Sequence, residues 1–513
     1  MVPCPDCEMA SCSSRGRCTG KRAKKTGRRR SSQWGRENYI QHRYKDMLFL
    51  VVTDTEETDT EETNTVVKRV RKTMVTHPSN TTDWGWGSAM PHEIIHKIFQ
   101  LVVDSEGAVP TLCRLAQVCR LWRQVASSPD LWQRVSVSHC WKIPNKKCPP
   151  QIKDKIKKTI KAVIQERLSQ VLDFSLHHWN DNVPLVLESL SSFCPLLTSL
   201  TLSHCSKVTA DALVSVGECC PQLTTLNLQD SQVCGNAVSL FLRVRGASLR
   251  CLYLSYSSQT NNIINLLAGG SCPELRVLEV NISIKERGTK MHLPVEGLQA
   301  ACPKLEVLRL LNVDFSLTSK FSSSTGGLGF RCLQELCIAT STDSDVDDSN
   351  CKRLLRDCTQ LKILDLRGCY MVTPECISVL PCPDLERLYL GIHCYGVSLP
   401  SNGCSLLTRR WQHSLQELDL TAQRYSESDM SQGLEILSRN GTNDTLQSLN
   451  LSGTKVTAAA VRHILSSCPA LTHVDLTSCR NIPRGLKCVY RGLEDVRQCL
   501  KTLCTKMQEM SGE

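Results

Sequence analysis

Cysteine and histidine are the residues here most able to bind a metal or act as nucleophiles, with 30 cysteines and 13 histidines among 513 residues. Cys4 and Cys7 form a Cys-x-x-Cys pair, which is half of a common zinc site. Cys12 and Cys18 are poorly spaced for the other half and have no histidine nearby. Because a structural zinc ion needs four well-placed ligands, we expect no metal and no cofactor.

Motifs for phosphate binding and acyl transfer are missing from the sequence. It holds neither a glycine-rich phosphate loop nor a nucleophile elbow. A cysteine and a histidine will meet somewhere by chance among so many, so a single such pair would not indicate catalysis. We therefore expect a non-catalytic protein.

Many of the other cysteines recur with a repeated tract, Cys-Pro-x-Leu-x-x-Leu-x-Leu-x-x-Cys. It starts at Cys194, and variants begin at Cys220, Cys272, Cys302, Cys382 and Cys468. A small, weakly polar thiol suits such crowded positions. Since the N-terminus lacks the apolar run of a secretory signal, we expect reduced structural thiols in a cytoplasmic or nuclear protein. The run Met47–Val52 is far too short to span a membrane.

The repeats predict the architecture of two-thirds of the chain. The first leucines of successive Leu-x-x-Leu-x-Leu units lie 24 to 31 residues apart, which gives about twelve leucine-rich repeats over residues 169–482. Each unit reads as a strand and then a helix. We predict an α/β solenoid, a horseshoe with parallel strands on its concave face, and expect a C-terminal cap helix within 483–513.

The concave face of such a solenoid is usually a binding surface. Period-two alternation places one residue of each strand, between two core leucines, on that face. Arg and Tyr are enriched in binding hot spots, and the middle of this row is chemically richest. The candidate binding residues are Tyr253, Glu279, Arg309, Asp365, Tyr389 and Asp419. Insertions at 314–330, 341–350 and 391–413 predict loops over the rim.

The net charge of +11 is confined to two segments. Residues 1–34 and 142–167 each carry nine basic and two acidic side chains, so the rest of the chain carries about −3. The repeats are therefore not a basic platform for nucleic acid. Residues 1–82 hold a basic block, Lys21–Arg30, and then an acidic one, Thr53–Thr65, which predicts a disordered tail with an import signal or a plain solvated charge run. Residues 139–168 read as a basic linker or helix.

Residues 83–138 predict a compact helical unit with two apolar helix faces. Met90-Pro91, Ile98-Phe99, the tract Val118–Arg123 and Leu131-Trp132 resemble an F-box. A short helical F-box followed by cysteine-containing repeats resembles the F-box/leucine-rich-repeat family of ubiquitin-ligase receptors. A helical cap of the solenoid is the simpler alternative for this unit.

The resemblance implies a function and a set of partners. The chain would be the substrate-recognition subunit of an SCF-type E3 ligase, bound to the Skp adaptor and, through it, to cullin and RING subunits, with an unknown protein substrate on the repeats. The implied adaptor-binding residues are Pro91, Ile94, Ile95, Ile98, Leu115, Val118 and Trp122. A non-degradative scaffold and an RNA-associated nucleolar protein remain as alternatives.

Overall fold

The structure is a computed structural model that describes residues 90–138, 150–282, 290–318, 329–341, 344–391, 402–438 and 443–511. Within these, nothing is said of the side chains of Ser138, 150–156, Thr159 and 510–511. The predicted tail with its charge blocks and Cys4 to Cys18 lies outside the described residues, as do parts of the three predicted rim loops.

One sheet of fourteen strands runs through the described residues. In spatial order its strands are β1 (Arg134–Ser138), β2 (Asp173–His177), β3 (Ser199–Ser203), β4 (Thr225–Asn227), β5 (Cys251–Ser255), β6 (Val277–Asn281), β8 (Val307–Leu311), β10 (Glu335–Cys337), β11 (Ile363–Asp365), β12 (Arg387–Tyr389), β13 (Glu417–Asp419), β14 (Ser448–Asn450), β15 (His473–Asp475) and β16 (Val489–Arg491). Every pair from β1 to β15 is parallel, and β16 pairs antiparallel with β15. A side sheet pairs β7 (Met291–Leu293) with β9 (Phe315–Leu317).

A layer of helices alternates with these strands along the chain. The N-terminal helical unit holds α2 (His92–Glu106), α3 (Thr111–Leu115), α4 (Arg120–Ala126) and the 3-10 helix η1 (Pro129–Trp132). The other helices are α5 (Pro150–Arg167), α6 (Val183–Phe193), α7 (Ala210–Cys219), α8 (Gly235–Arg245), η2 (Gly246–Ser248), α9 (Thr260–Ala268), α10 (Val295–Ala301), α11 (Asp348–Leu354), α12 (Pro374–Ser378), α13 (Gly403–Trp411), α14 (Glu427–Ile436), α15 (Ala458–Ser467) and α16 (Leu493–Ser511).

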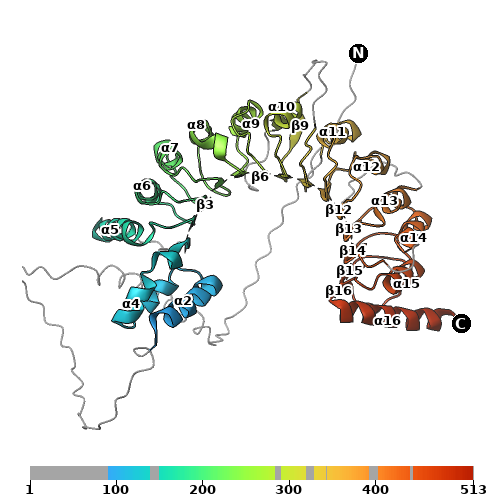
Figure 1. Cartoon of the computed structure of the whole chain (residues 1–513). Helices are drawn as coiled ribbons and strands as arrows, with labels where there is room; N and C mark the ends of the chain where they lie inside the picture. The colour runs from blue at the N-terminus through green and yellow to red at the C-terminus, as the bar shows by residue number, and fades with distance from the viewer. Residues whose placement is uncertain are drawn as a thin grey trace, which may run out of the picture. The chain divides into compact units, whose positions relative to one another are not determined.

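Within the repeats, the strands line the inner side and the helices α5 to α15 lie on the outer side (Figure 1). The predicted class, a helical unit followed by parallel strand–helix repeats, is confirmed. No helix among the described residues is long and apolar enough to cross a membrane.

The core is a ladder of leucines in register across the sheet. Leu226 lies opposite Leu200 on one side and Leu252 on the other, and all three are fully buried. Because side chains alternate along a strand, the residue between two core leucines of one strand faces the solvent on the inner side of the sheet. One repeat could not bury its leucine face alone, so the stacked repeats share one continuous core.

Buried thiols form a second ladder between neighbouring repeats. The Cys220 Sγ donates to the Cys194 carbonyl at 3.5 Å, and the Cys302 Sγ donates to the Cys272 carbonyl at 3.7 Å. Burial raises the pKa of Cys272 to about 12, so its thiolate, the reactive form, is disfavoured. Cys219, which precedes Cys220 in the chain, lies outside this ladder, and its side chain is exposed.

A strand–helix unit precedes the first repeat that the leucine spacing revealed. Strand β1 pairs with β2, and α5 packs against α6 on the outer side. The segment at 139–168, which reads as a basic linker or helix in the sequence, therefore contains the helix of an additional unit. The leucine pattern did not reveal this unit because β1 has Val135 and Val137 in place of the repeated leucines.

Three helices of the repeats are preceded by a threonine, and two of these threonines cap their helix. The Thr373 hydroxyl accepts from the Cys376 N–H, and the Thr457 hydroxyl accepts from the Ala460 N–H, each at 3.2 Å. Such caps satisfy one of the free N–H groups at a helix start. Thr209 occupies the same position but makes no side-chain cap bond.

In most repeats, the turn that follows the strand contains one residue with a positive φ, in the left-handed conformation. His178 and His204 occupy this position, with φ of 60° and 53°. The shared conformation stacks their imidazoles, with ring centroids 4.5 Å apart and an interplanar angle of 3°. His177, at the end of β2, lies beside this stack, so three titratable rings gather at one edge of the sheet.

Stability is expected to depend on pH through His177. Burial, and then the charges of His178 and His204, lower the pKa of His177 below its ordinary value. The unfolded chain therefore binds a proton where the folded chain does not, and stability falls as pH drops through about 6.5. Thermal melts from about pH 7.5 to 5.5 should show a smaller drop for His177→Gln than for the wild type. Equal drops in both proteins would contradict this account.

Candidate functional site

An apolar stripe on helix α2 is exposed to solvent. Ile94, Ile98 and Leu101 follow the i, i+4, i+7 spacing of one helical face, and Val118 from the segment after α3 is exposed as well. Their exposed fractions are 51% for Ile94, 37% for Ile98, 61% for Leu101 and 60% for Val118. These are four of the ten large apolar side chains exposed among the described residues. Such a concentration in one small unit indicates a surface for a partner.

The other predicted adaptor-binding residues divide into surface and interior. Pro91 is exposed, and Leu115 and Trp122 are half-buried. Ile95 is 1% exposed, so its place on the contact surface is a correction: it packs inside the unit. Trp122 is held edge-on against the buried Phe99, with ring centroids 5.2 Å apart. It therefore stabilises the packing of the unit and also contributes part of its surface.

Sequence reasoning missed Leu101, although its spacing from Ile94 and Ile98 was a usable signal. It also overlooked that His92 to His96 spell His-Glu-x-x-His, a pattern that binds zinc in some hydrolases. In the structure, the His96 Nε2 lies 2.6 Å from the Asp130 carboxylate. No group of three or more possible metal ligands is assembled anywhere in the described parts of the chain. The pattern is therefore no evidence for a metal centre here.

The six predicted binding residues of the repeats share one row across the inner face of the sheet. The register joins Tyr253 to Glu279 and Glu279 to Arg309, and it joins Tyr389 to Asp365 and Asp419 on either side. The alternation in the sequence therefore placed the row correctly. It did not determine which side chains are free to meet a partner.

Arg309 is fixed between two carboxylates from neighbouring repeats. Its Nε and one terminal nitrogen donate to both oxygens of Glu335 at 2.6 and 2.9 Å, and the other donates to Glu279 at 2.9 Å. The second Glu279 oxygen accepts from the Gln229 amide at 2.8 Å. These bonds raise the pKa of Arg309, so its guanidinium stays charged. They also hold the side chains of Arg309, Glu279 and Glu335 in one arrangement on the inner face.

Asp365 and Asp419 are corrections to the predicted contact surface. They are only 4% and 9% exposed. Asp365 accepts from the backbone N–H and the guanidinium of Arg367, and Asp419 accepts from the backbone N–H and hydroxyl of Thr421. Both carboxylates therefore close the turns that follow their strands. The same turn follows Asn227, Asn450 and Asp475.

Tyr389, an aromatic residue of the row, is held in place by neighbouring side chains. Its hydroxyl donates to Glu417 at 2.6 Å, and the Arg367 guanidinium lies 5.3 Å from its ring centroid. Burial and the Glu417 bond raise the pKa of Tyr389, so the hydroxyl stays protonated. Together with Arg387, 3.4 Å from Glu417, these side chains form a second cluster, centred on β12, three strands along the sheet from Arg309 on β8.

The helical unit is similar to a known family of domains. Residues 88–138 match the family model described as F-box-like. The helical unit is an F-box-like domain. F-box/LRR-repeat protein 4 of Bos taurus is 26% identical over 60% of this chain and 52% of its own length. F-box protein SKIP1 of Arabidopsis thaliana is 22% identical over 43% of this chain and 62% of its own length. The chain thus spans about half to three-fifths of these relatives, and it combines an F-box-like domain with leucine-rich repeats.

Among solved structures, the yeast complex of Rad7 and Elc1 contains a similar chain. The match covers 80% of this chain and 85% of that chain, at 18% identity and with a TM-score of 0.37. A superposition this loose supports no conclusion about function. The fold of this chain therefore rests on its own strand pairing and helix layer.

The F-box is joined to the repeats through the sheet. The Gln133 carbonyl accepts from the Leu172 and Asp173 N–H groups, and β1 continues this pairing with β2. The buried Trp132 donates its Nε1–H to the Ala126 carbonyl at 2.8 Å, and Arg167 of α5 lies 5.6 Å from its ring centroid. Trp132 therefore packs inside the chain.

Two acidic residues of the inner face were missed at the sequence level. Glu335 and Glu417 lie one alternation before the predicted row, two residues ahead of Cys337 and Asp419. Period two places them on the same face, so the signal was present in the sequence. Their importance appears only through their partners, Arg309 and Tyr389.

Replacing Arg309 by methionine is expected to destabilise the middle repeats by about 1–2 kcal/mol, after allowance for the partial exposure of the cluster. The change leaves Glu279 and Glu335 close together without the cation between them. Urea denaturation of the full chain measures the loss. Adding Glu279→Gln and Glu335→Gln should restore most of it, and a single variant as stable as the wild type would contradict the argument.

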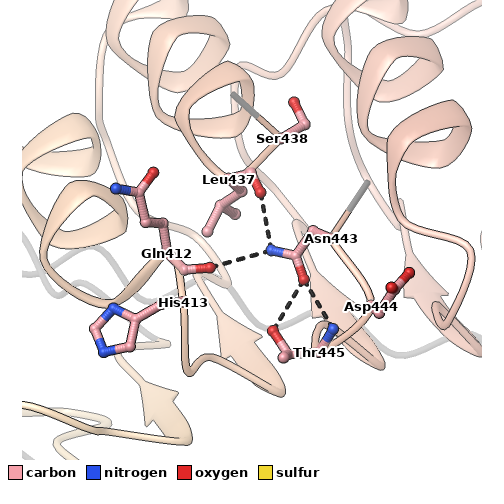
Figure 2. A pocket seen from close by; sticks show the side chains of 7 residues that line it. All are labelled: Gln412, His413, Leu437, Ser438, Asn443, Asp444 and Thr445. Carbon is pink, nitrogen blue, oxygen red and sulfur yellow. Dashed lines mark hydrogen bonds between the residues drawn. The ribbon is translucent and has the colours of Figure 1, made fainter. Parts of the chain in front are cut away.

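A small pocket lies between two late repeats (Figure 2). Its volume is about 150 Å³, and it is lined by Gln412, His413, Leu437, Ser438, Asn443, Asp444 and Thr445. The Asn443 amide group donates to the Leu437 and Gln412 carbonyls and accepts from Thr445. The polar atoms of Asn443 therefore join the repeats to each other. We assign no ligand to it.

Proposed function

We propose that this chain is the substrate-recognition subunit of an SCF-type E3 ubiquitin ligase. Its F-box would dock the Skp adaptor, and the leucine-rich repeats would hold a protein substrate for ubiquitination. The observation that carries this proposal is the exposure of four large apolar side chains, Ile94, Ile98, Leu101 and Val118, on this one small unit. Apolar groups gathered in this way favour burial against a partner.

The proposed adaptor surface keeps most of the residues expected from the sequence. The contacts would come from Pro91, Ile94, Ile98, Leu101, Leu115, Val118 and Trp122, with Ile95 supporting them from inside. The proposed substrate surface centres on Tyr253, Glu279, Arg309 and Tyr389. Asp365 and Asp419 would shape its edge without making direct contacts.

In this proposal the chain is a non-catalytic receptor without a cofactor. Cullin and RING subunits, reached through the adaptor, would bring the ubiquitin-loaded enzyme. The receptor would raise the effective concentration of that enzyme at the substrate, which is how tethering accelerates a reaction. We propose a cytoplasmic or nuclear site of action. Among family members, the tracts Leu252–Thr260 and Ile482–Val496 look most similar to F-box/LRR-repeat protein 6, and that finer resemblance stays a prediction.

Purification of the tagged full-length chain from cells tests this proposal. Skp adaptor, cullin and RING subunits should co-purify, and the assembly should transfer ubiquitin to co-purifying proteins when supplied with activated ubiquitin-conjugating enzyme. If the adaptor is absent from the purified material, the proposal fails. If the adaptor and cullin are present but no bound protein is modified, the non-degradative scaffold is favoured.

A further inference from the structure

A line of basic side chains follows the loops at the C-terminal end of the repeats. Arg424, Lys455 and Arg480 each lie five residues after the inner-face position of three successive strands, β13, β14 and β15. Arg484 follows in the last of these loops, and all four side chains are exposed. We call these four residues the terminal basic edge. Because neighbouring strands are about 4.8 Å apart, the same loop position in successive repeats forms a row.

Hydrogen bonds hold the three loops side by side. The Ala422 N–H donates to the Ser452 carbonyl, and the Gly453 N–H donates to the Thr477 carbonyl, each at 2.7 Å. The Asn481 amide donates to the Lys455 carbonyl at 3.3 Å. The basic residues are therefore presented by a connected set of loops at a fixed spacing.

One basic side chain in a loop near the start of the repeats is paired with an acid of the preceding repeat. Lys207, in a loop of the first repeats, contacts Asp181 of the preceding repeat at 2.6 Å. Within the described residues, the side chains of Lys455, Arg480 and Arg484 make no ion pair. Lys455, Arg480 and Arg484 therefore differ from Lys207, which has an acidic partner one repeat away.

We propose that the terminal basic edge binds an acidic segment of a partner protein, rich in Asp and Glu. The inference depends on the proposed function in one respect, because it takes the partner protein to be a substrate of the ligase. Charge complementarity supports it, because three neighbouring cations lack a partner within the described chain. The segment would lie along the loops, across the ends of β13 to β15.

An acidic peptide fits this edge better than a nucleic acid does. The row is narrow, and carboxylates of Asp475 and Glu427 lie beside it on β15 and at the start of α14. These would repel a broad polyanion. Single-stranded nucleic acid also needs aromatic faces for stacking, whereas Tyr425, the aromatic residue in these loops, is buried.

Fluorescence anisotropy with a labelled oligoglutamate peptide and the full-length chain tests the proposal. The triple variant Lys455→Glu, Arg480→Glu, Arg484→Glu should weaken peptide binding at least about tenfold. The matched control is Lys157→Glu, Lys158→Glu, Lys161→Glu, which makes the same charge change at exposed lysines of α5. This control should alter the affinity less than about twofold.

Three results would overturn the inference. They are unchanged peptide binding by the edge variant, equal weakening by both variants, and tighter binding of a single-stranded RNA oligomer that is lost in the edge variant. Adaptor binding by the edge variant is measured in parallel. Since the edge is remote in sequence from the F-box, adaptor binding should persist, so a failure of peptide binding alone leaves the proposed function standing.

Discussion

Replacing Val118 by aspartate is expected to weaken adaptor binding by the full-length chain about 100-fold or more. Val118 is 60% exposed, so the folded chain can carry a charge there. In a complex, the carboxylate would be buried against apolar groups without a partner, which costs several kcal/mol. Surface plasmon resonance with purified Skp adaptor measures the change in Kd.

The control for this variant is the same substitution at Val379. That side chain is 69% exposed, but it lies in the repeats just after α12. Val379→Asp should bind the adaptor as the wild type does. Similar weakening by both variants would point to a general effect of added charge, and full binding by Val118→Asp would remove this face from the proposed interface.

Replacing Gly368 by alanine is expected to destabilise the chain by about 3 kcal/mol or more. Gly368 has φ of 85°, in the left-handed region that side chains disfavour. A Cβ atom there would also overlap the Thr340 carbonyl oxygen of the preceding repeat. Backbone cannot move aside cheaply in stacked repeats, so both costs apply.

Gly453 gives a matched control, because it occupies the same turn position with φ of 71°. A Cβ atom there would lie 3.5 Å from its nearest neighbour, in the backbone of Ala422. Ala422 itself holds this position with φ of 56°. Gly453→Ala should therefore cost only about 1 kcal/mol, from the backbone conformation. Hydrogen exchange and urea denaturation compare the two, and equal losses would refute the steric argument.

The repeats were predictable because their signal is local and repeated. Each leucine at a core position is specified by period two within its own strand, and successive units repeat the same frame. The predicted row from Tyr253 to Asp419 therefore appears in the structure with the register intact. The additional unit of β1 and α5 was missed because its strand lacks the repeated leucines.

The role of individual polar residues was not predictable in this way. Asp365 and Asp419 share the row with Arg309, but they turn back to their own loops. Arg309 instead reaches across to Glu279 and Glu335, 30 and 26 residues away in sequence. Such choices depend on which atoms of neighbouring repeats come within hydrogen-bonding distance.

The sequence alone determined the class of fold, the position of the inner row and the F-box, because each depends on spacing within a short window. Only the tertiary structure decided that Ile95 is internal while Leu101 and Val118 are exposed, and that Lys455, Arg480 and Arg484 form a row. Burial and charge pairing are properties of side chains that meet across helices or repeats. A periodic pattern gives the face on which a residue lies, but the packed neighbours determine what that residue can contact.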